Sequence, residues 1–165
     1  MKKEKYAKLW LQLIVIAASL LALALLLYFV VIVSFQNGAQ STDVTMRVAG
    51  QIAAGVFENP TKEQIEAVSL MIRYGAHLAL FFVVGSVTAF VSMVIFRKFF
   101  RIIGILLSGV ACYMLAYYTE FFKQFIDGRH FQMSDVRLNW FGSLAGIICM
   151  VASYFLNRLL VKLSS

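Results

Sequence analysis

The chain has 165 residues, of which 61% are hydrophobic and 14% are charged. Charged residues make up about a quarter of a typical soluble domain, so this composition excludes an ordinary soluble protein. The net charge of +7 does not indicate a nucleic-acid partner, because the basic residues are distributed among loops in the pattern of a membrane protein. We therefore expect an all-α integral membrane protein, with a single transmembrane domain over residues 1–165.

The first apolar segment, residues 10–33, follows a basic N-terminus and predicts a retained membrane helix. Its apolar core is longer than the roughly 7 to 15 residues of a signal-peptide core. No small-residue cleavage pattern follows in SFQNGAQST, the sequence that begins at Ser34. A cleaved signal peptide is therefore the less favoured interpretation.

The loop after this segment, residues 34–74, is the longest part of the chain outside the predicted spans. A hydrophobic residue recurs there every four positions, at Val44, Val48, Ile52 and Val56. This spacing predicts a short amphipathic helix that lies against the bilayer surface or the mouth of the bundle, where it would shape an entrance.

A second helix is predicted to begin near the end of the same loop. Asn59 and Pro60 suit a helix start, and Thr61 and Gln64 have the spacing of a capping box. We expect this helix to continue without a break into the second apolar segment, residues 75–96.

Two more apolar segments, residues 102–122 and 140–161, complete a small predicted bundle of four transmembrane helices. Cys112 and Cys149 fall near the middle of these segments, without supporting ligands for a metal, and we interpret both as small buried apolar residues. The chain lacks a metal-binding signature, a phosphate-binding loop and a nucleophile elbow, so we predict neither a metal nor a cofactor.

The charges predict an orientation for the four spans. Nine basic residues, opposed only by Glu4, lie before the first span, between the second and third, and around the end of the fourth: Lys2, Lys3, Lys5, Lys8, Arg97, Lys98, Arg101, Arg158 and Lys162. The other two loops carry six basic residues and seven acids. The positive-inside rule then predicts that both termini are cytoplasmic and that the amphipathic helix lies in the first external loop.

Polar residues gather at the external ends of all four predicted spans. Residues four apart share a helical face, so each span presents its polar residues together. The candidates, in chain order, are Ser34, Gln36, Ser41, Arg73, His77, Glu120, Gln124, Arg129, Asp135 and Asn139. Gly142 and Gly146 lie on the face of Asp135 and would allow a neighbouring helix to approach closely. Polar groups are expensive to hold in apolar surroundings, so their convergence predicts one site at the outer leaflet.

Several of these residues also have a purely structural interpretation. Glu120 can be a solvated carboxylate at the interface, and His77 can be a packing residue. Arg129 follows a turn and can be a plain loop residue, or it can pair with a carboxylate or grip an anionic group. Asp135 can act as a helix cap.

In this order the residues resemble the VanZ-like family of small bacterial membrane proteins, whose founding member is associated with low-level resistance to teicoplanin. The resemblance covers most of the chain and has three parts. They are Ser34, Gln36 and Ser41 after the first span; Arg73, Ala76 and His77 at the second; and a centre made of Thr119-Glu120, Gln124, Gly128-Arg129, Asp135-Val136, Asn139 and Gly142.

Two positions depart from the family pattern. Thr119 stands where the family has the first of two adjacent acids, which weakens a paired-acid mechanism and favours a binding role or one that uses a single carboxylate. Arg73 replaces the commoner lysine and keeps the positive charge.

The resemblance implies a multi-pass protein of the bacterial cytoplasmic membrane with a role in the cell envelope. The first hypothesis is a binding protein for a lipid-linked cell-wall precursor, an anionic lipid or a lipoglycopeptide, through Gln124, Arg129, Asn139, Arg73, Ser34, Gln36 and Ser41. The second is an intramembrane enzyme that modifies a lipid-linked group, with Glu120 or Asp135 as base and His77 as proton carrier. The third is a structural subunit whose polar seam packs against a partner.

Overall fold

The computed structural model describes residues 2–35, 38–96 and 100–164, which form five α-helices joined by short connections. In chain order these are α1 (Lys2–Ser34), α2 (Gly38–Val56), α3 (Lys62–Ile95), α4 (Phe100–Lys123) and α5 (Met133–Leu163). The described residues contain no strand, so the prediction of an all-α protein is confirmed.

Four of the helices can cross a membrane. Leu9–Ser34 within α1, and α3, α4 and α5 over their full lengths, are long and apolar enough to do so. Many of their large hydrophobic side chains lie on the surface, as expected where a helix meets lipid tails instead of water. The chain is thus a multi-pass membrane protein.

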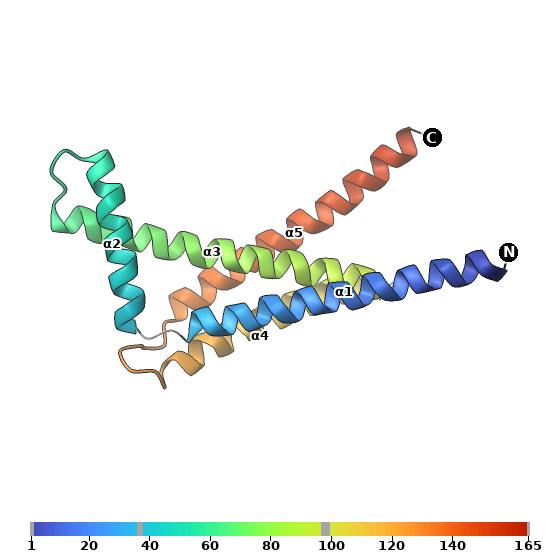
Figure 1. Ribbon diagram of the computed structural model, residues 1–165, viewed down its shortest axis with the longest axis horizontal. Coiled ribbons are helices and arrows are strands. Elements are labelled where there is room, and N and C mark those ends of the chain that lie inside the picture. Colours follow the sequence, from blue (N-terminus) through green and yellow to red (C-terminus); the bar gives the residue numbers. More distant parts are fainter. Residues whose placement is uncertain (1, 36–37, 97–99, 165) are drawn as a thin grey trace.

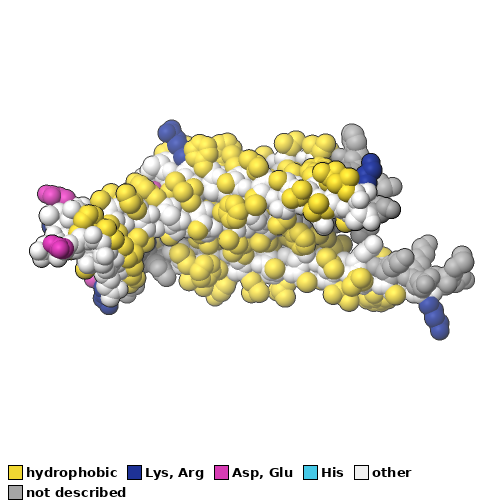
Figure 2. Space-filling model, turned by 90° about the horizontal axis from the view of Figure 1, so that it is seen from above, with side chains coloured by type: hydrophobic (Ala, Val, Ile, Leu, Met, Phe, Trp, Pro, Cys, Tyr) yellow, Lys and Arg dark blue, Asp and Glu magenta, His cyan; other side chains and the backbone are white. Residues whose placement is uncertain are grey.

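The arrangement of the helices defines two ends of the molecule (Figure 1). Both termini lie at one end, which we call the terminal end, and α2 and the α4–α5 loop lie at the opposite end, which we call the α2 end. The orientation of these ends across the membrane stays a prediction from the charge distribution. On the face seen in Figure 2, charged side chains appear toward the two ends, and hydrophobic side chains dominate the length between them.

The helix α3 begins where the sequence predicts a cap. The Thr61 hydroxyl accepts a hydrogen bond from the Gln64 amide, and the Gln64 side chain accepts one from the Thr61 amide, which confirms the capping box. From there α3 continues for 34 residues, or about 50 Å, so the prediction of an unbroken helix into the second span is also confirmed. This length carries its first turns beyond a hydrocarbon core of about 30 Å.

The closest helix packing in the described bundle is between α3 and α5. A side-chain carbon added at Gly146 would collide with the Phe82 carbonyl oxygen, and one added at Gly85 would collide with the Ser143 carbonyl. At Gly142 it would come within 2.7 Å of the Leu78 carbonyl oxygen. The predicted close approach at Gly142 and Gly146 is therefore confirmed.

The buried core consists mostly of small and medium-sized side chains, namely Val30, Phe81, Val84, Ala89, Cys112, Ala116, Val136 and Ile147. Cys112 is among them, as predicted, but Cys149 is exposed. The prediction that Cys149 is buried was wrong, because its position near the middle of a span places it at a depth in the membrane without placing it on an inward face.

The helix α2 crosses the bundle at the α2 end and contacts α3 (Figure 1). Ala49 and Ala53 are fully buried, whereas the predicted apolar stripe lies on an exposed flank, where Val44 and Val56 are 59% and 70% exposed. The helix thus packs against the bundle mouth, one of its two predicted locations, but through its alanines, and the predicted apolar stripe faces away from the bundle.

Candidate functional site

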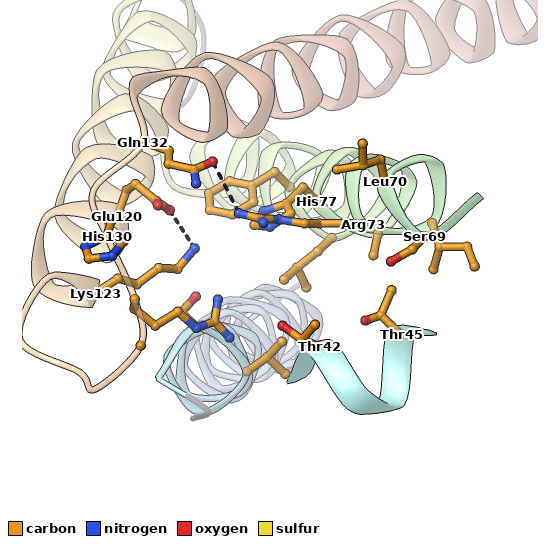
Figure 3. Close-up of a pocket in the computed structure, with 18 residues that line it drawn as sticks. Thr42, Thr45, Ser69, Leu70, Arg73, His77, Glu120, Lys123, His130 and Gln132 are labelled. Atoms are coloured by element: carbon orange, nitrogen blue, oxygen red, sulfur yellow. Dashed lines mark hydrogen bonds and ion pairs between the residues drawn. The ribbon is translucent and has the colours of Figure 1, made fainter. Parts of the chain in front are cut away.

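A pocket of about 390 Å³ opens at the α2 end of the bundle. Its lining comes from α1, α2, α3, α4 and the loop between α4 and α5. In Figure 3, Arg73 and His77 of α3 and Glu120 and Lys123 of α4 reach toward the space that Thr42 and Thr45 of α2 border from the other side. Part of the wall is apolar and includes Val33, Leu70, Ile72, Leu80 and Phe81.

Arg73 and Asp135 join α3 to α5 beside the pocket. Arg73 Nη2 lies 2.6 Å from Asp135 Oδ2 and also donates a long hydrogen bond of 3.5 Å to Gln132 Oε1. The Asp135 side chain is only 1% exposed, and its other oxygen, Oδ1, has no hydrogen-bond partner among the described residues. No side chain caps α5, whose N-cap residue is Gln132. Asp135 therefore serves as the counterion of Arg73 and not as a helix cap.

His77 lies one turn below Arg73 on the same face of α3. Its Nδ1 is 2.8 Å from the Asn139 side-chain oxygen, and its Nε2 is 3.9 Å from Asp135 Oδ2. Since an amide oxygen can only accept, Nδ1 carries the hydrogen in this arrangement. The close contact between α3 and α5 thus brings Arg73 and His77 opposite Asp135 and Asn139, which are about sixty residues away in the sequence.

Glu120 and Lys123 form a second ion pair on the α4 side of the pocket. Lys123 Nζ lies 2.5 Å from Glu120 Oε2, and the two side chains are only 3% and 1% exposed. Removing charges from water to this extent is costly unless they are paired, and so is separating the pair. This pair is the most deeply buried charged feature among the described residues.

Arg129 follows Gly128, whose φ of 75° turns the chain back toward the bundle. Burial lowers the pKa of the Arg129 guanidinium, and Arg73 acts in the same direction, whereas Glu120 and Asp135 oppose the change. Arginine stays protonated in proteins, so this change in pKa mainly reflects the partial removal of its charge from water. Its Nε is buried without a hydrogen-bond partner among the described residues.

A comparison with protein families identifies the chain. The model of the family described as VanZ/LLP1 matches residues 19–156, which includes every pocket residue named above. The chain belongs to the VanZ/LLP1 family. Neither the comparison with curated proteins nor that with solved structures found a match.

The structure of this VanZ/LLP1 protein brings together seven of the ten predicted site residues. Ser34, Arg73, His77, Glu120 and Arg129 line the pocket, and Asp135 and Asn139 contact its lining. Gln36 lies outside the described residues, and the side chain of Ser41 is likewise not described.

Gln124 is exposed and is not part of the pocket lining. The helical projection that placed Gln124 beside Glu120 does not extend so far, because α4 ends at Lys123 and Gln124 belongs to the following turn.

Sequence reasoning missed several pocket residues, of which Lys123 is the most important. Lys123 was counted only as a loop charge, although it is three residues after Glu120 on one helix, a spacing that predicts an ion pair. Gln132 and His130 had no signal beyond their place in the polar loop. Thr42 and Thr45 enter the pocket because α2 folds back over the bundle, which no local pattern predicts.

Thr119, the departure from the VanZ-like pattern, is buried beside the site without taking part in it. Its hydroxyl donates to the Leu115 carbonyl at 2.8 Å and lies 3.2 Å from the Ala116 carbonyl, both in its own helix. It is 5% exposed and does not line the pocket. The site of this VanZ/LLP1 protein therefore has Glu120 as its single carboxylate on α4.

Proposed function

We propose that this VanZ/LLP1 protein acts in the bacterial cytoplasmic membrane, with the α2 end outward, and binds the polar head of a lipid-linked envelope component or of a lipoglycopeptide. Binding of this kind would give low-level resistance to glycopeptides such as teicoplanin. The observation that carries the proposal is the pocket into which Arg73, Lys123 and Arg129 converge from three different elements. Family membership supports the envelope role.

The composition of the pocket suits a ligand that is part polar and part lipid. Guanidinium groups recognise phosphate and carboxylate groups through pairs of parallel hydrogen bonds. The apolar wall formed by residues such as Val33 and Leu70 offers a surface for the first carbons of a lipid chain.

The alternative function is an enzyme that modifies a lipid-linked group. It is favoured by one observation: Asp135 Oδ1 has no partner among the described residues, and the oriented His77 ring lies 3.9 Å from the other oxygen of the same carboxylate. Against it, Glu120 and Asp135 each have a cationic partner, so a carboxylate that accepts a proton from a substrate also loses the attraction of its ion pair.

The two functions are separated by the fate of the lipids. Purified protein reconstituted into vesicles of bacterial lipids would, as an enzyme, generate a product visible by mass spectrometry of the lipid extract and lost in Asp135→Asn. Unchanged lipids after prolonged incubation over a range of pH would remove the enzymatic alternative.

The resistance proposal is tested by teicoplanin susceptibility in a bacterial strain that lacks the gene and receives the wild type, Arg129→Ala or Asp135→Asn. Arg137→Ala is the matched control, because Arg137 is exposed on α5 at the same end of the bundle and does not line the pocket. At equal membrane abundance, we expect the wild type and the control to protect and the two pocket variants to protect no better than an empty vector. Equal protection by all four proteins would refute the proposal.

A further inference from the structure

The charges around the pocket do not balance. The described residues that line it or pair with its lining carry three fixed cations, Arg73, Lys123 and Arg129, against two carboxylates, Glu120 and Asp135. Each carboxylate forms an ion pair with one cation: Asp135 with Arg73, and Glu120 with Lys123. Arg129 is left without an ion pair among the described residues. Counting these fixed charges, the pocket has room for one additional negative charge before its ion pairs must rearrange.

The donors of the pocket also point to a particular shape of anion. Arg73, Lys123 and Arg129 come from α3, α4 and the α4–α5 loop, so they approach the pocket from different directions. A carboxylate is planar and is satisfied by one guanidinium fork, whereas a phosphate presents its oxygens tetrahedrally to donors on several sides. Arg129 lines the pocket and has no ion-pair partner among the described residues, so its guanidinium is the cation still available to such an anion.

The apolar surroundings of the pocket indicate that this anion is the head group of a lipid. The pocket lies at the end of four membrane-spanning helices, and Val33, Leu70, Ile72 and Phe81 form apolar parts of its wall. Leu70 is 49% exposed, so the apolar wall reaches the outer surface of the bundle. A head group in the pocket can therefore keep its acyl chains against the apolar sides of the bundle.

We propose that the pocket recognises a phosphodiester with a single negative charge on a membrane lipid whose head group carries no cation, as in phosphatidylglycerol. This inference rests on the proposed function, since it assigns a ligand class to the same pocket. A zwitterionic phospholipid binds less well, because its ammonium would enter surroundings that already hold an unneutralised guanidinium. A lipid without phosphate leaves the partly buried Arg129 without a counterion.

Binding of short-chain lipids to the full-length protein in detergent micelles, followed by native mass spectrometry, tests the inference. The probes are dihexanoyl phosphatidylglycerol, dihexanoyl phosphatidylcholine, dihexanoylglycerol and glycerophosphoglycerol, the deacylated form of the first. We expect phosphatidylglycerol to bind about tenfold or more tightly than each of the others.

A pair of variants tests whether the lipid binds in the pocket: Arg129→Gln and its matched control Arg137→Gln. Each removes one positive charge at the same end of the bundle, but Arg137 does not line the pocket. We expect phosphatidylglycerol to bind about tenfold more weakly to Arg129→Gln and unchanged to Arg137→Gln. Arg129→Lys keeps the charge but lacks the planar guanidinium, so its affinity for phosphatidylglycerol should lie between those of the other two variants. This variant also controls for any misfolding of Arg129→Gln.

Each contrary result overturns a defined part of the inference. Equal binding of phosphatidylcholine would overturn the requirement for a head group without a cation, and equal binding of dihexanoylglycerol would overturn phosphate recognition. Equal binding of glycerophosphoglycerol would overturn the assignment to a lipid. Unchanged binding to Arg129→Gln would overturn the role of Arg129.

Failure of this inference and failure of the proposed function give different results. If phosphatidylglycerol does not bind but the protein still protects against teicoplanin, the ligand class is wrong and the envelope function stands. If phosphatidylglycerol binds as expected but Arg129→Gln protects like the wild type, the ligand class stands and the proposed function is wrong.

Discussion

The two ends of the bundle both carry basic side chains, but the charges are held differently. At the α2 end, Lys123 and Arg73 pair with carboxylates that are only 1% exposed. At the terminal end, the guanidinium groups of Arg101 and Arg158 lie over the Tyr154 ring, 4.7 and 5.3 Å from its centroid, and no described carboxylate pairs with them. Stacking on an aromatic ring stabilises such interfacial arginines, although the Nε of Arg101, like that of Arg129, is buried without a hydrogen-bond partner among the described residues. Buried ion pairs are expensive, so the α2 end is the one whose charges call for a functional explanation.

The largest effect on stability is expected when one partner of the buried pair at the α2 end is removed. Lys123→Met leaves the Glu120 carboxylate buried without a counterion and should lower the free energy of unfolding by about 3–5 kcal/mol. Reversible unfolding in mixed micelles measures this loss.

The double variant Glu120→Gln with Lys123→Met is the control for that result. It removes both charges of the pair, so neither partner stays buried without the other and most of the stability should return. If the single variant is as stable as the wild type, Glu120 and Lys123 do not form a buried ion pair in the membrane. The charges at the two ends would then not differ in the way described.

The α3–α5 contact that connects the two ends should be the next most sensitive feature. Gly146→Ala places a methyl group against the Phe82 carbonyl and should cost about 1–3 kcal/mol, because the backbones must separate. The same separation would move Arg73 and His77 away from Asp135 and Asn139, so lipid binding should weaken as well.

Gly75→Ala is the matched control for Gly146→Ala, since a methyl group at Gly75 meets no atom within 4 Å. We expect Gly75→Ala to be neutral or stabilising by about 0.5–1 kcal/mol, as alanine is the better helix former. Equal destabilisation by both variants would show that the contact at Gly146 is not special.

The smallest effect is expected at the terminal end. Arg101→Gln removes the guanidinium over the Tyr154 ring and its hydrogen bond to the Tyr154 hydroxyl, and it should cost about 0.5–1 kcal/mol. Phosphatidylglycerol binding should not change, because Arg101 does not line the pocket. A loss as large as that of Lys123→Met would erase the distinction between the two ends.

The fold was predictable from the sequence wherever one local property decided the structure. Apolar length predicted the four membrane helices, and the Thr61–Gln64 spacing predicted the start of α3. Small residues at Gly142 and Gly146 predicted a close helix contact. The inward or outward direction of a residue within a span was not predictable for Cys149, because lipid and protein surroundings are both apolar and leave no hydrophobic contrast.

The candidate site was predictable only in part for a different reason. Polar residues at the span ends indicated which side chains would meet, and Arg73, His77, Glu120 and Asn139 do lie together. The partners could not be assigned from the sequence. Lys123 was hidden among loop charges because the end of α4 was not known, and Thr42 reaches the pocket only through the folding back of α2.

Cysteine accessibility in intact cells tests whether the pocket opens at the outer surface of the membrane. In a background of Cys112→Ala and Cys149→Ser, single cysteines at Asp127 and Ser164 report on the α2 end and the terminal end, and both positions are exposed. We predict that a membrane-impermeant maleimide labels Asp127→Cys in intact cells and Ser164→Cys only after permeabilisation. The opposite pattern would place the pocket in the inner leaflet and contradict the account of an envelope ligand bound from outside.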